Sequence, residues 1–218
     1  MIENLFLTTI KFLSIMTIFL HNNDLPSDIK FNSAIAIDSE AMGLNINRDR
    51  LCLIQISAGD GNAHLIKFNG TYNAPNLKRI LCDDSIQKIF HYARFDLAII
   101  FYYLQINFKN IYCTKIASRL ARTYTDSHGL KNLCEELLGI EISKKQQTSD
   151  WGNTILSDKQ LEYAASDVLY LHQLRDKLQQ MIIRENRQII LNECFKFLPT
   201  RVELDLKGFN NIDIFNHS

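Results

Sequence analysis

Glycine and proline are scarce in this 218-residue chain, which contains 8 glycines and 3 prolines. A chain that is poor in these residues and has no low-complexity tract is not typical of disordered or linker segments. The sequence also contains no internal repeat, which argues against a repeat architecture. Its length is typical of one domain, or of one domain with a short appendage.

An excess of either charge is also missing, because 24 basic residues balance 24 acidic ones. A neutral chain is not expected to hold long nucleic acid strongly by general electrostatic attraction. A small site that binds only a chain end through metal ions is compatible with this balance. Hydrophobic residues make up 46% of the chain, which is enough for a substantial core.

Cysteine is present but unclustered, at positions 52, 82, 113, 134 and 194. The sequence has no CxxC or Cys/His cluster, which argues against a zinc site. The number of cysteines is odd, and Cys52 lies in an apolar, strand-like run. We therefore expect free thiols in a reducing compartment and a cytoplasmic protein.

A long unbroken hydrophobic run is absent from the sequence as well. The segment 5–20, LFLTTIKFLSIMTIFL, is apolar but is interrupted by Lys11, and it is short for a membrane span. It has neither the basic region nor the cleavage site of a signal peptide. We expect no membrane association, with a weak anchor as the alternative. Translation from Met16 is a second interpretation, so residues 1–15 are treated as an uninformative N-terminal extension.

Short apolar runs alternate with helical patterns along the rest of the chain. Strands are predicted over 33–38, 51–57, 63–68 and 86–92, and within 106–115. Helices are predicted over 74–83, 94–104, 129–139, 157–183 and 184–197, with Ser157 as an N-cap, Gly139 closing the third and Pro199 ending the last. This order predicts an α/β fold with a mixed sheet flanked by helices, as one domain over 16–200 with a polar tail at 201–218.

Four acidic side chains stand out by their positions. Asp38 and Glu40 lie at the end of the first predicted strand, where residues i and i+2 share a face. Asp96 follows the fourth strand, and Asp167 lies on the helix predicted over 157–183. Sites form where strands end beside helix starts in open sheets, so the four carboxylates are expected to converge. Magnesium prefers such oxygen ligands, and two ions held in this way can promote hydrolysis of a phosphodiester.

Tyr163 lies four residues before Asp167, so the two side chains point the same way on one helical face. A phenol with an ordinary pKa of about 10 is better suited to orient a water molecule than to deprotonate it. Taken alone, this pair is typical of a surface hydrogen bond, Asp96 of a first-turn helix acid, and Asp38 with Glu40 of a solvated turn. Together and in this order, they favour a phosphodiesterase site.

Three motifs in the chain resemble those of the DEDD superfamily of 3′–5′ exonucleases. They are IAIDSEAMGL, HYARFDL and LEYAASDVLYL, and the tyrosine of the third motif resembles that of the DEDDy branch. The stretch HGLKNLCEELLGIEISKKQQTSDW and the helix after it resemble ribonuclease D, and the similarity runs over about 30–183. The resemblance implies an RNase H-like fold with a five-stranded mixed sheet.

The resemblance also implies a chemistry for the site. It implies two Mg²⁺ or Mn²⁺ ions held by Asp38, Glu40, Asp96 and Asp167, while Tyr163 holds the attacking water in line. In the family, this water attacks the last phosphodiester at an RNA 3′ end and a 5′-mononucleotide is released. The implied partner is therefore an RNA 3′ end, and the implied role is processing of tRNA or other structured RNA.

Two features depart from the larger ribonuclease D proteins. Position 92, often asparagine in the family, is Tyr92, whose ring can stack on a base instead. The chain ends at residue 218, soon after the resemblance ends, which leaves too little sequence for a helical HRDC domain. The chain therefore resembles the short, single-domain form.

Two other functions stay open on the sequence alone. A 3′–5′ exonuclease that acts on DNA, including single-stranded DNA, has the same carboxylates, because discrimination depends on contacts to the 2′-hydroxyl. A non-enzymatic nuclease fold that serves as a binding module is the second, although such proteins usually lose a metal ligand. The sequence indicates no particular oligomeric state.

Further side chains near the motifs are candidates for contacts to the substrate. Met42 and Leu44 wedge against the last base or pack a turn onto the core. His91 is either a hydrogen-bonded structural histidine, the favoured interpretation, or a ligand. Arg94 meets a phosphate or pairs with an acid, and Trp151 borders the substrate groove or covers the core.

Overall fold

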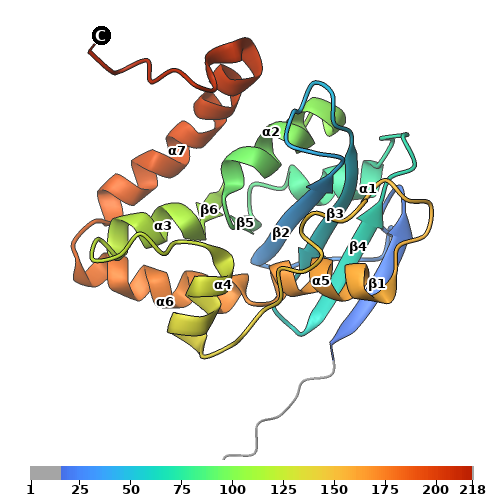
Figure 1. Cartoon of the computed structure of the whole chain (residues 1–218), viewed down its shortest axis with the longest axis horizontal. Coiled ribbons are helices and arrows are strands. Elements are labelled where there is room, and N and C mark those ends of the chain that lie inside the picture. Colours follow the sequence, from blue (N-terminus) through green and yellow to red (C-terminus); the bar gives the residue numbers. More distant parts are fainter. Residues whose placement is uncertain (1–15, 218) are drawn as a thin grey trace, which may run out of the picture.

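A six-stranded mixed sheet runs through the middle of the molecule. The computed structural model describes residues 16–217, and Figure 1 shows the arrangement of its strands and helices. The strands, in the order β1-β4-β3-β2-β5-β6 across the sheet, are β1 (Thr17–Asn22), β2 (Ala34–Ala41), β3 (Leu51–Ser57), β4 (Asn62–Lys67), β5 (Gln87–Phe90) and β6 (Ile111–Cys113). Because β2 pairs antiparallel with β3 and parallel with β5, it lies in the interior of the sheet.

The central strands are buried on both faces. All seven residues of β3 are buried, as is usual for an apolar strand covered by helices on both sides. Along β2 the side chains alternate, so Ile35 and Ile37 face one apolar cluster while Ala36 faces the other. The register places Asp38 opposite Gln55, and the pairing becomes irregular immediately after Glu40.

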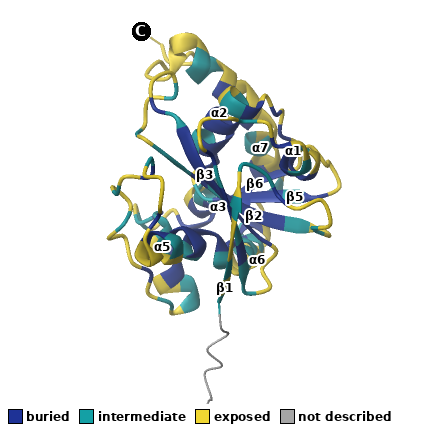
Figure 2. Cartoon of the chain, turned by 90° about the vertical axis from the view of Figure 1, so that its right-hand side faces the viewer, coloured by how far each residue is buried: buried dark blue, intermediate teal, exposed yellow. Residues whose placement is uncertain are grey.

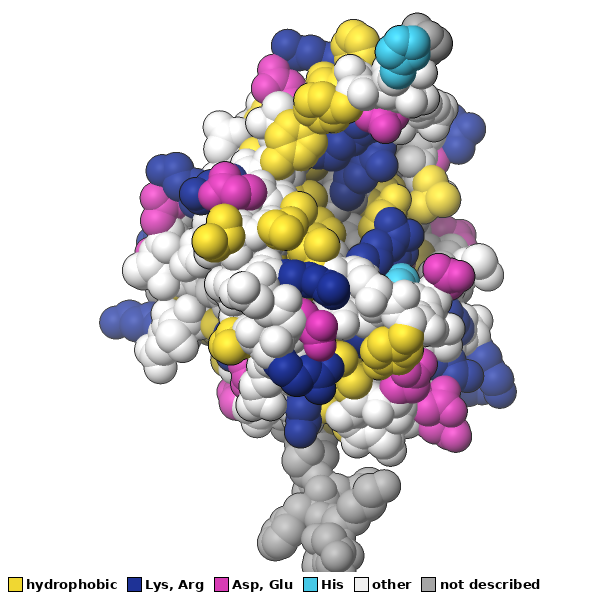
Figure 3. Space-filling model, turned by 90° about the vertical axis from the view of Figure 1, so that its left-hand side faces the viewer, with side chains coloured by type: hydrophobic (Ala, Val, Ile, Leu, Met, Phe, Trp, Pro, Cys, Tyr) yellow, Lys and Arg dark blue, Asp and Glu magenta, His cyan; other side chains and the backbone are white. Residues whose placement is uncertain are grey.

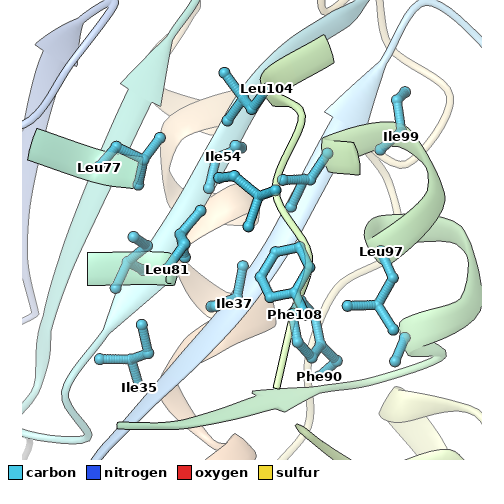
Figure 4. Close-up of a cluster of buried hydrophobic side chains, with 14 of the residues drawn as sticks. Ile35, Ile37, Ile54, Leu77, Leu81, Phe90, Leu97, Ile99, Leu104 and Phe108 are labelled. Atoms are coloured by element: carbon cyan, nitrogen blue, oxygen red, sulfur yellow. The ribbon is translucent and has the colours of Figure 1, made fainter. Parts of the chain in front are cut away.

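Helices cover the sheet on both sides, which gives three layers. One face is packed by α1 (Pro75–Leu81), α2 (Ala93–Leu104) and the second half of α7 (Gln188–Leu204), and Figure 4 shows side chains of α1 and α2 against those of β2. The other face is packed by α3 (Thr114–Ala121), α4 (Leu130–Leu133), the π-helical turn η1 (Cys134–Leu138), α5 (Asp158–Leu169) and α6 (Leu171–Arg184). In Figure 2, the buried residues accordingly gather in the strands and on the inner sides of these helices.

Charges of both signs are interspersed on the surface. Figure 3 shows lysine and arginine beside aspartate and glutamate on one face of the molecule, with apolar side chains between them. Exposed ion pairs, such as Lys109 with Asp84 at 2.9 Å, also join side chains of opposite charge. A large single-sign field of the kind that attracts long nucleic acid is therefore not visible on this face.

The predicted fold class is confirmed, with one more strand than the five expected. The additional strand, β1, pairs in parallel with β4 along its whole length. Its first four residues, 17–20, lie in the apolar run 5–20, where no strand was predicted, because a parallel partner distant in the sequence leaves no local turn signal. The first 15 residues lie outside the described part of the chain.

Two helix boundaries differ from those predicted from the sequence. The single helix predicted over 157–183 is two helices, because the chain turns at Tyr170 between α5 and α6. Pro199 lies inside α7, so the prediction that it ends this helix was wrong. The predicted N-cap is confirmed, since Ser157 and Gln160 form a reciprocal capping box at the start of α5.

The first part of the expected polar tail packs on the domain. Helix α7 continues to Leu204 and is followed by the π-helical turn η2 (Asp205–Phe209). Asp205 accepts hydrogen bonds from Arg94 of α2 and Arg201 of α7. This contact joins the end of α7 to the start of α2.

The cysteines all carry free thiols, and Cys52, Cys113 and Cys134 are buried. Among residues 16–217, no helix is both long enough and apolar enough to cross a membrane. The expectation of a cytoplasmic protein stays a prediction.

Candidate active site

Three different elements bring the predicted carboxylates to one edge of the sheet. Asp38 and Glu40 lie near the end of β2 and point to the side covered by α5. Asp96 lies in the first turn of α2, which follows β5, the parallel neighbour of β2. Asp167 lies on α5, which packs across β2 and β3. The alternation of β2 and the crossover after β5 therefore direct these side chains toward one place.

A cavity of about 400 Å³ contains all four carboxylates and Tyr163. One carboxylate oxygen each of Asp38, Glu40 and Asp167 lies within 4.8 Å of the others, the spacing of a metal-binding group. Asp96 lines the same cavity but is held differently, since its Oδ1 accepts a hydrogen bond of 2.5 Å from the Ser39 hydroxyl. Three carboxylates thus meet directly, and the fourth stands beside them.

The carboxyl groups of the cavity are strongly perturbed. Desolvation raises the pKa of Asp38 from 3.8 to about 7. Desolvation, followed by the charges of Asp38, Asp167 and Asp96, raises the pKa of Glu40 to about 10. The pKa values of Asp96 and Asp167 also lie well above the ordinary range, because of desolvation and then the charge of Asp38. A divalent cation would offset this repulsion, and an all-oxygen ligand set suits Mg²⁺ or Mn²⁺.

Tyr163 lies one helical turn before Asp167 and lines the same cavity. Desolvation, and then the charge of Asp167, raises the pKa of the phenol above its ordinary value of 10. The hydroxyl therefore remains protonated at neutral pH. It can hold a water molecule by a hydrogen bond, but it cannot act as a base there.

His91 lines the cavity but is engaged by the protein. Its Nδ1 lies 2.9 Å from the Thr114 hydroxyl, which in turn donates to the Phe90 carbonyl. Desolvation lowers the pKa of His91 to about 3, so the ring is neutral. This arrangement agrees with the structural interpretation of the histidine.

Tyr92 forms part of the cavity rim and has an unusual backbone conformation. Its φ of 66° and ψ of 43° are left-handed, a region in which asparagine is enriched and bulky residues are uncommon. This conformation explains physically why asparagine suits the position in the family. The ring is half exposed, and Lys115 Nζ lies 4.3 Å from its centroid.

The remaining candidates divide between the rim and the protein interior. Leu44 lines the cavity and is 84% exposed, and Met42 is half exposed and packs beside Gly152. Arg94 donates hydrogen bonds from Nε to Asp205 Oδ2 at 2.5 Å and from Nη2 to Asp205 Oδ1 at 2.7 Å. Of the two alternatives for Arg94, the structure thus contains the pair with an acid and not a free guanidinium. Trp151 is only 2% exposed, which agrees with a ring that covers the core rather than one that contacts a ligand.

A protein-family model described as 3′–5′ exonuclease matches residues 16–183. The chain belongs to this family. Among curated proteins, the exonuclease is 34% identical over 146 residues to DNA polymerase I of Aquifex aeolicus and 31% identical over 153 residues to ribonuclease D of Gluconacetobacter diazotrophicus. These matches cover 67% and 70% of this chain, but only 24% and 39% of the respective relatives. The exonuclease thus spans well under two thirds of the length of these curated relatives.

Solved structures extend the comparison to the whole fold. Brucella melitensis NrnC is 56% identical, with a TM-score of 0.89 and coverage of 93% of this chain and 100% of that one. NrnC has also been solved with bound Mg²⁺ and bound to pGG. Escherichia coli RNase D is 27% identical, with a TM-score of 0.70 and coverage of 83% and 49%. The predicted ribonuclease D resemblance and the RNase H-like fold are confirmed.

Several side chains in the exonuclease cavity were not identified from the sequence. Ser39 lies between Asp38 and Glu40 and holds Asp96. Lys115 and Lys131 are two basic groups of the lining. Alternation along β2 turns Ser39 to the face opposite Asp38 and Glu40, toward α2, and only the packing of α2 shows that its hydroxyl reaches Asp96. The two lysines come from α3 and α4, and no local pattern relates these segments.

Proposed function

We propose that the chain is a metal-dependent 3′–5′ exoribonuclease that removes 5′-mononucleotides from RNA 3′ ends. The meeting of Asp38, Glu40, Asp96, Asp167 and Tyr163 in one cavity supports this proposal most directly. In it the four carboxylates hold two Mg²⁺ or Mn²⁺ ions, as the oxygen donors and their raised pKa values favour. When bound, such ions neutralise the carboxylates and the scissile phosphate and make water more nucleophilic.

The protein groups then have distinct tasks in the reaction. Asp38, Glu40, Asp96 and Asp167 would hold the metals, with the carboxylate of Asp96 oriented by the Ser39 hydroxyl. The protonated hydroxyl of Tyr163 holds the attacking water in line with the last phosphodiester. The distances in the cavity and a phenol that stays protonated support this division.

The rim of the cavity suits the end of a nucleotide chain. Leu44 and Tyr92 offer an aliphatic and an aromatic surface on which bases can pack. Lys115, Lys131 and Lys144 supply positive charge for phosphates beside the carboxylates. These three lysines lie beside the carboxylates although the chain as a whole is neutral, which fits recognition of a chain end rather than of a long duplex.

A short RNA is the first substrate to test. NrnC, which was solved bound to pGG, is 55% identical, and the match covers 93% of this chain. Processing of tRNA or another structured RNA remains the second RNA substrate, in view of the ribonuclease D relatives. In the assay, Mn²⁺ or Mg²⁺ is added to purified protein with pGG, with a labelled single-stranded RNA and with a tRNA precursor.

The direction of cleavage can be read by comparing RNA labelled at its 3′ end with RNA labelled at its 5′ end. A 3′ label should leave first as a mononucleotide, whereas a 5′ label should stay on a ladder of shortening products. The Asp167→Asn variant is the matched control, since it removes one metal-binding charge with little change in shape. Unchanged trimming by that variant would assign the activity to a contaminant, and no release from any RNA would refute the proposal.

DNA is the competing substrate, because the first curated relative named above is a DNA polymerase. The carboxylate site is equally suited to both polymers, and only contacts to the 2′-hydroxyl distinguish them. RNA and DNA of the same sequence, labelled differently and mixed in one reaction, give the preference directly. Faster loss of DNA would favour a DNA exonuclease.

A further inference from the structure

Trp151 is buried directly behind Tyr163. The two ring centroids are 6.0 Å apart, with an interplanar angle of 37°. The indole is 2% exposed, whereas the phenol is half-buried and lines the carboxylate cavity. Trp151 therefore lies on the protein side of Tyr163, out of reach of a ligand in the cavity.

The loop that carries Trp151 is fastened on both sides of the indole. Before it, the Gln160 side chain donates to the Ser149 hydroxyl at 3.2 Å and to the Asp150 carbonyl at 3.1 Å. After it, Arg50 donates to the Gly152 carbonyl at 3.0 Å. Gln160 stands on α5, the helix that also carries Tyr163, so the loop and the phenol are held relative to the same helix.

No polar contact of its own holds the indole in place. Its Nε1 is buried and has no hydrogen-bond partner within the described residues. A buried donor without a partner is unfavourable, so this position gains nothing from the N–H group. What remains is the flat ring, whose contact with Tyr163 is its specific feature.

We propose that Trp151 is a positioning residue for Tyr163, an inference that rests on the proposed exonuclease function. The indole backs the phenol and keeps its hydroxyl beside Asp167, where it can hold the attacking water. Without the indole, the phenol ring has free volume behind it, and the hydroxyl no longer occupies one place. Trp151 thus acts on the reaction through Tyr163 and does not touch the substrate.

Steady-state kinetics with pGG and Mn²⁺ separate this role from the alternatives. Trp151→Leu should lower kcat by about 10- to 100-fold, since a displacement of about 1 Å is worth this much, and should leave KM within about threefold. Trp151→Phe should restore kcat to within about threefold of wild type, because it keeps a flat ring. A rise in KM without a fall in kcat would instead make Trp151 a substrate contact and overturn the proposal.

A double-mutant cycle tests whether the effect passes through Tyr163. In the Tyr163→Phe background, Trp151→Leu should reduce kcat by less than about threefold further, because the hydroxyl that it positions is already absent. Full additivity of the two losses would mean that Trp151 acts independently, and would refute the inference. Phe108→Leu is the matched control, since it shortens a buried ring in the cluster on the other face of the sheet. Its kcat should be unchanged.

Fluorescence gives a readout that does not depend on activity. Trp151 is the only tryptophan in the chain, so selective excitation reports on this contact alone. Tyr163→Ala should shift the emission to longer wavelength, because one covered face of the indole becomes open to water. An unshifted spectrum would mean that the rings are not packed in solution and would overturn the inference. Wild-type protein that releases no nucleotide would refute the exonuclease proposal instead, whatever the spectrum.

Discussion

Replacing Asp38 by asparagine should make the metal-free protein less sensitive to pH. The pKa of Asp38 is raised from 3.8 to about 7 in the folded protein, so the folded state keeps a proton that the unfolded chain releases. The free energy of unfolding of the wild type must therefore fall as the pH rises from about 4 to about 7. Asparagine keeps the shape of the side chain but has no proton to lose.

The size of the effect follows from the pKa itself. Between pH 5 and about pH 7, the Asp38 carboxyl is ionised in the unfolded chain but still protonated in the folded protein. Over these roughly two pH units, the free energy of unfolding falls by about 1.4 kcal/mol per unit. Asp38 alone thus removes about 3 kcal/mol of stability from the wild type in this interval. The difference in unfolding free energy between the two pH values should shrink by about this amount in Asp38→Asn.

Urea unfolding at pH 5 and pH 8, with a chelator present, measures this difference. Asp28→Asn is the control, because Asp28 is exposed and its replacement should leave the pH dependence unchanged. Excess Mg²⁺ should stabilise the wild type at pH 8 far more than the variant. A pH dependence equal to that of the wild type, or an Asp38→Asn protein that is less stable at pH 8, would show that Asp38 is not held in a repulsive carboxylate cluster.

Three further predictions concern Tyr163, Tyr92 and Asp205. Tyr163→Phe should bind Mg²⁺ with unchanged affinity in calorimetry but turn over pGG at least about tenfold more slowly, and wild-type turnover would remove its assigned role. Tyr92→Asn should raise the free energy of unfolding by about 0.5–1 kcal/mol, since asparagine accepts the left-handed backbone. Its KM should rise because the aromatic ring is lost. A lower melting temperature of this variant would contradict the reasoning. Asp205→Asn should lower the free energy of unfolding by about 1–3 kcal/mol, because it weakens the contact with Arg94. Amide exchange over 205–211 should become faster for the same reason. Unchanged exchange would mean that this contact does not hold the segment on the domain.

The parts of the site that the sequence predicts well are those that depend on local geometry. Asp38 and Glu40 could be placed together because side chains in a strand alternate, and Tyr163 with Asp167 because one helical turn separates them. The order of strands and helices then allowed only a few ways to bring these pairs to one edge of the sheet.

The features that the sequence left open or missed depend on contacts between distant segments. Arg94 lies two residues from Asp96, yet its partner is Asp205, which no local pattern connects with it. Trp151 could face a ligand or the core equally well on the sequence, since only the fastening of its loop decides the side. The turn at Tyr170 has no proline or glycine to mark it, so periodicity carried the predicted helix through that position.

The position of β2 in the interior of the sheet separates two kinds of sequence change in this protein. Asp38 and Glu40 stand on a strand with a partner on either side, so their places are fixed by the framework of the domain. Leu44 and Tyr92 stand on connecting segments at the cavity mouth, where neighbouring residues tolerate replacement. The cavity mouth can therefore diverge between descendants of one ancestral sequence while the carboxylate centre is inherited intact.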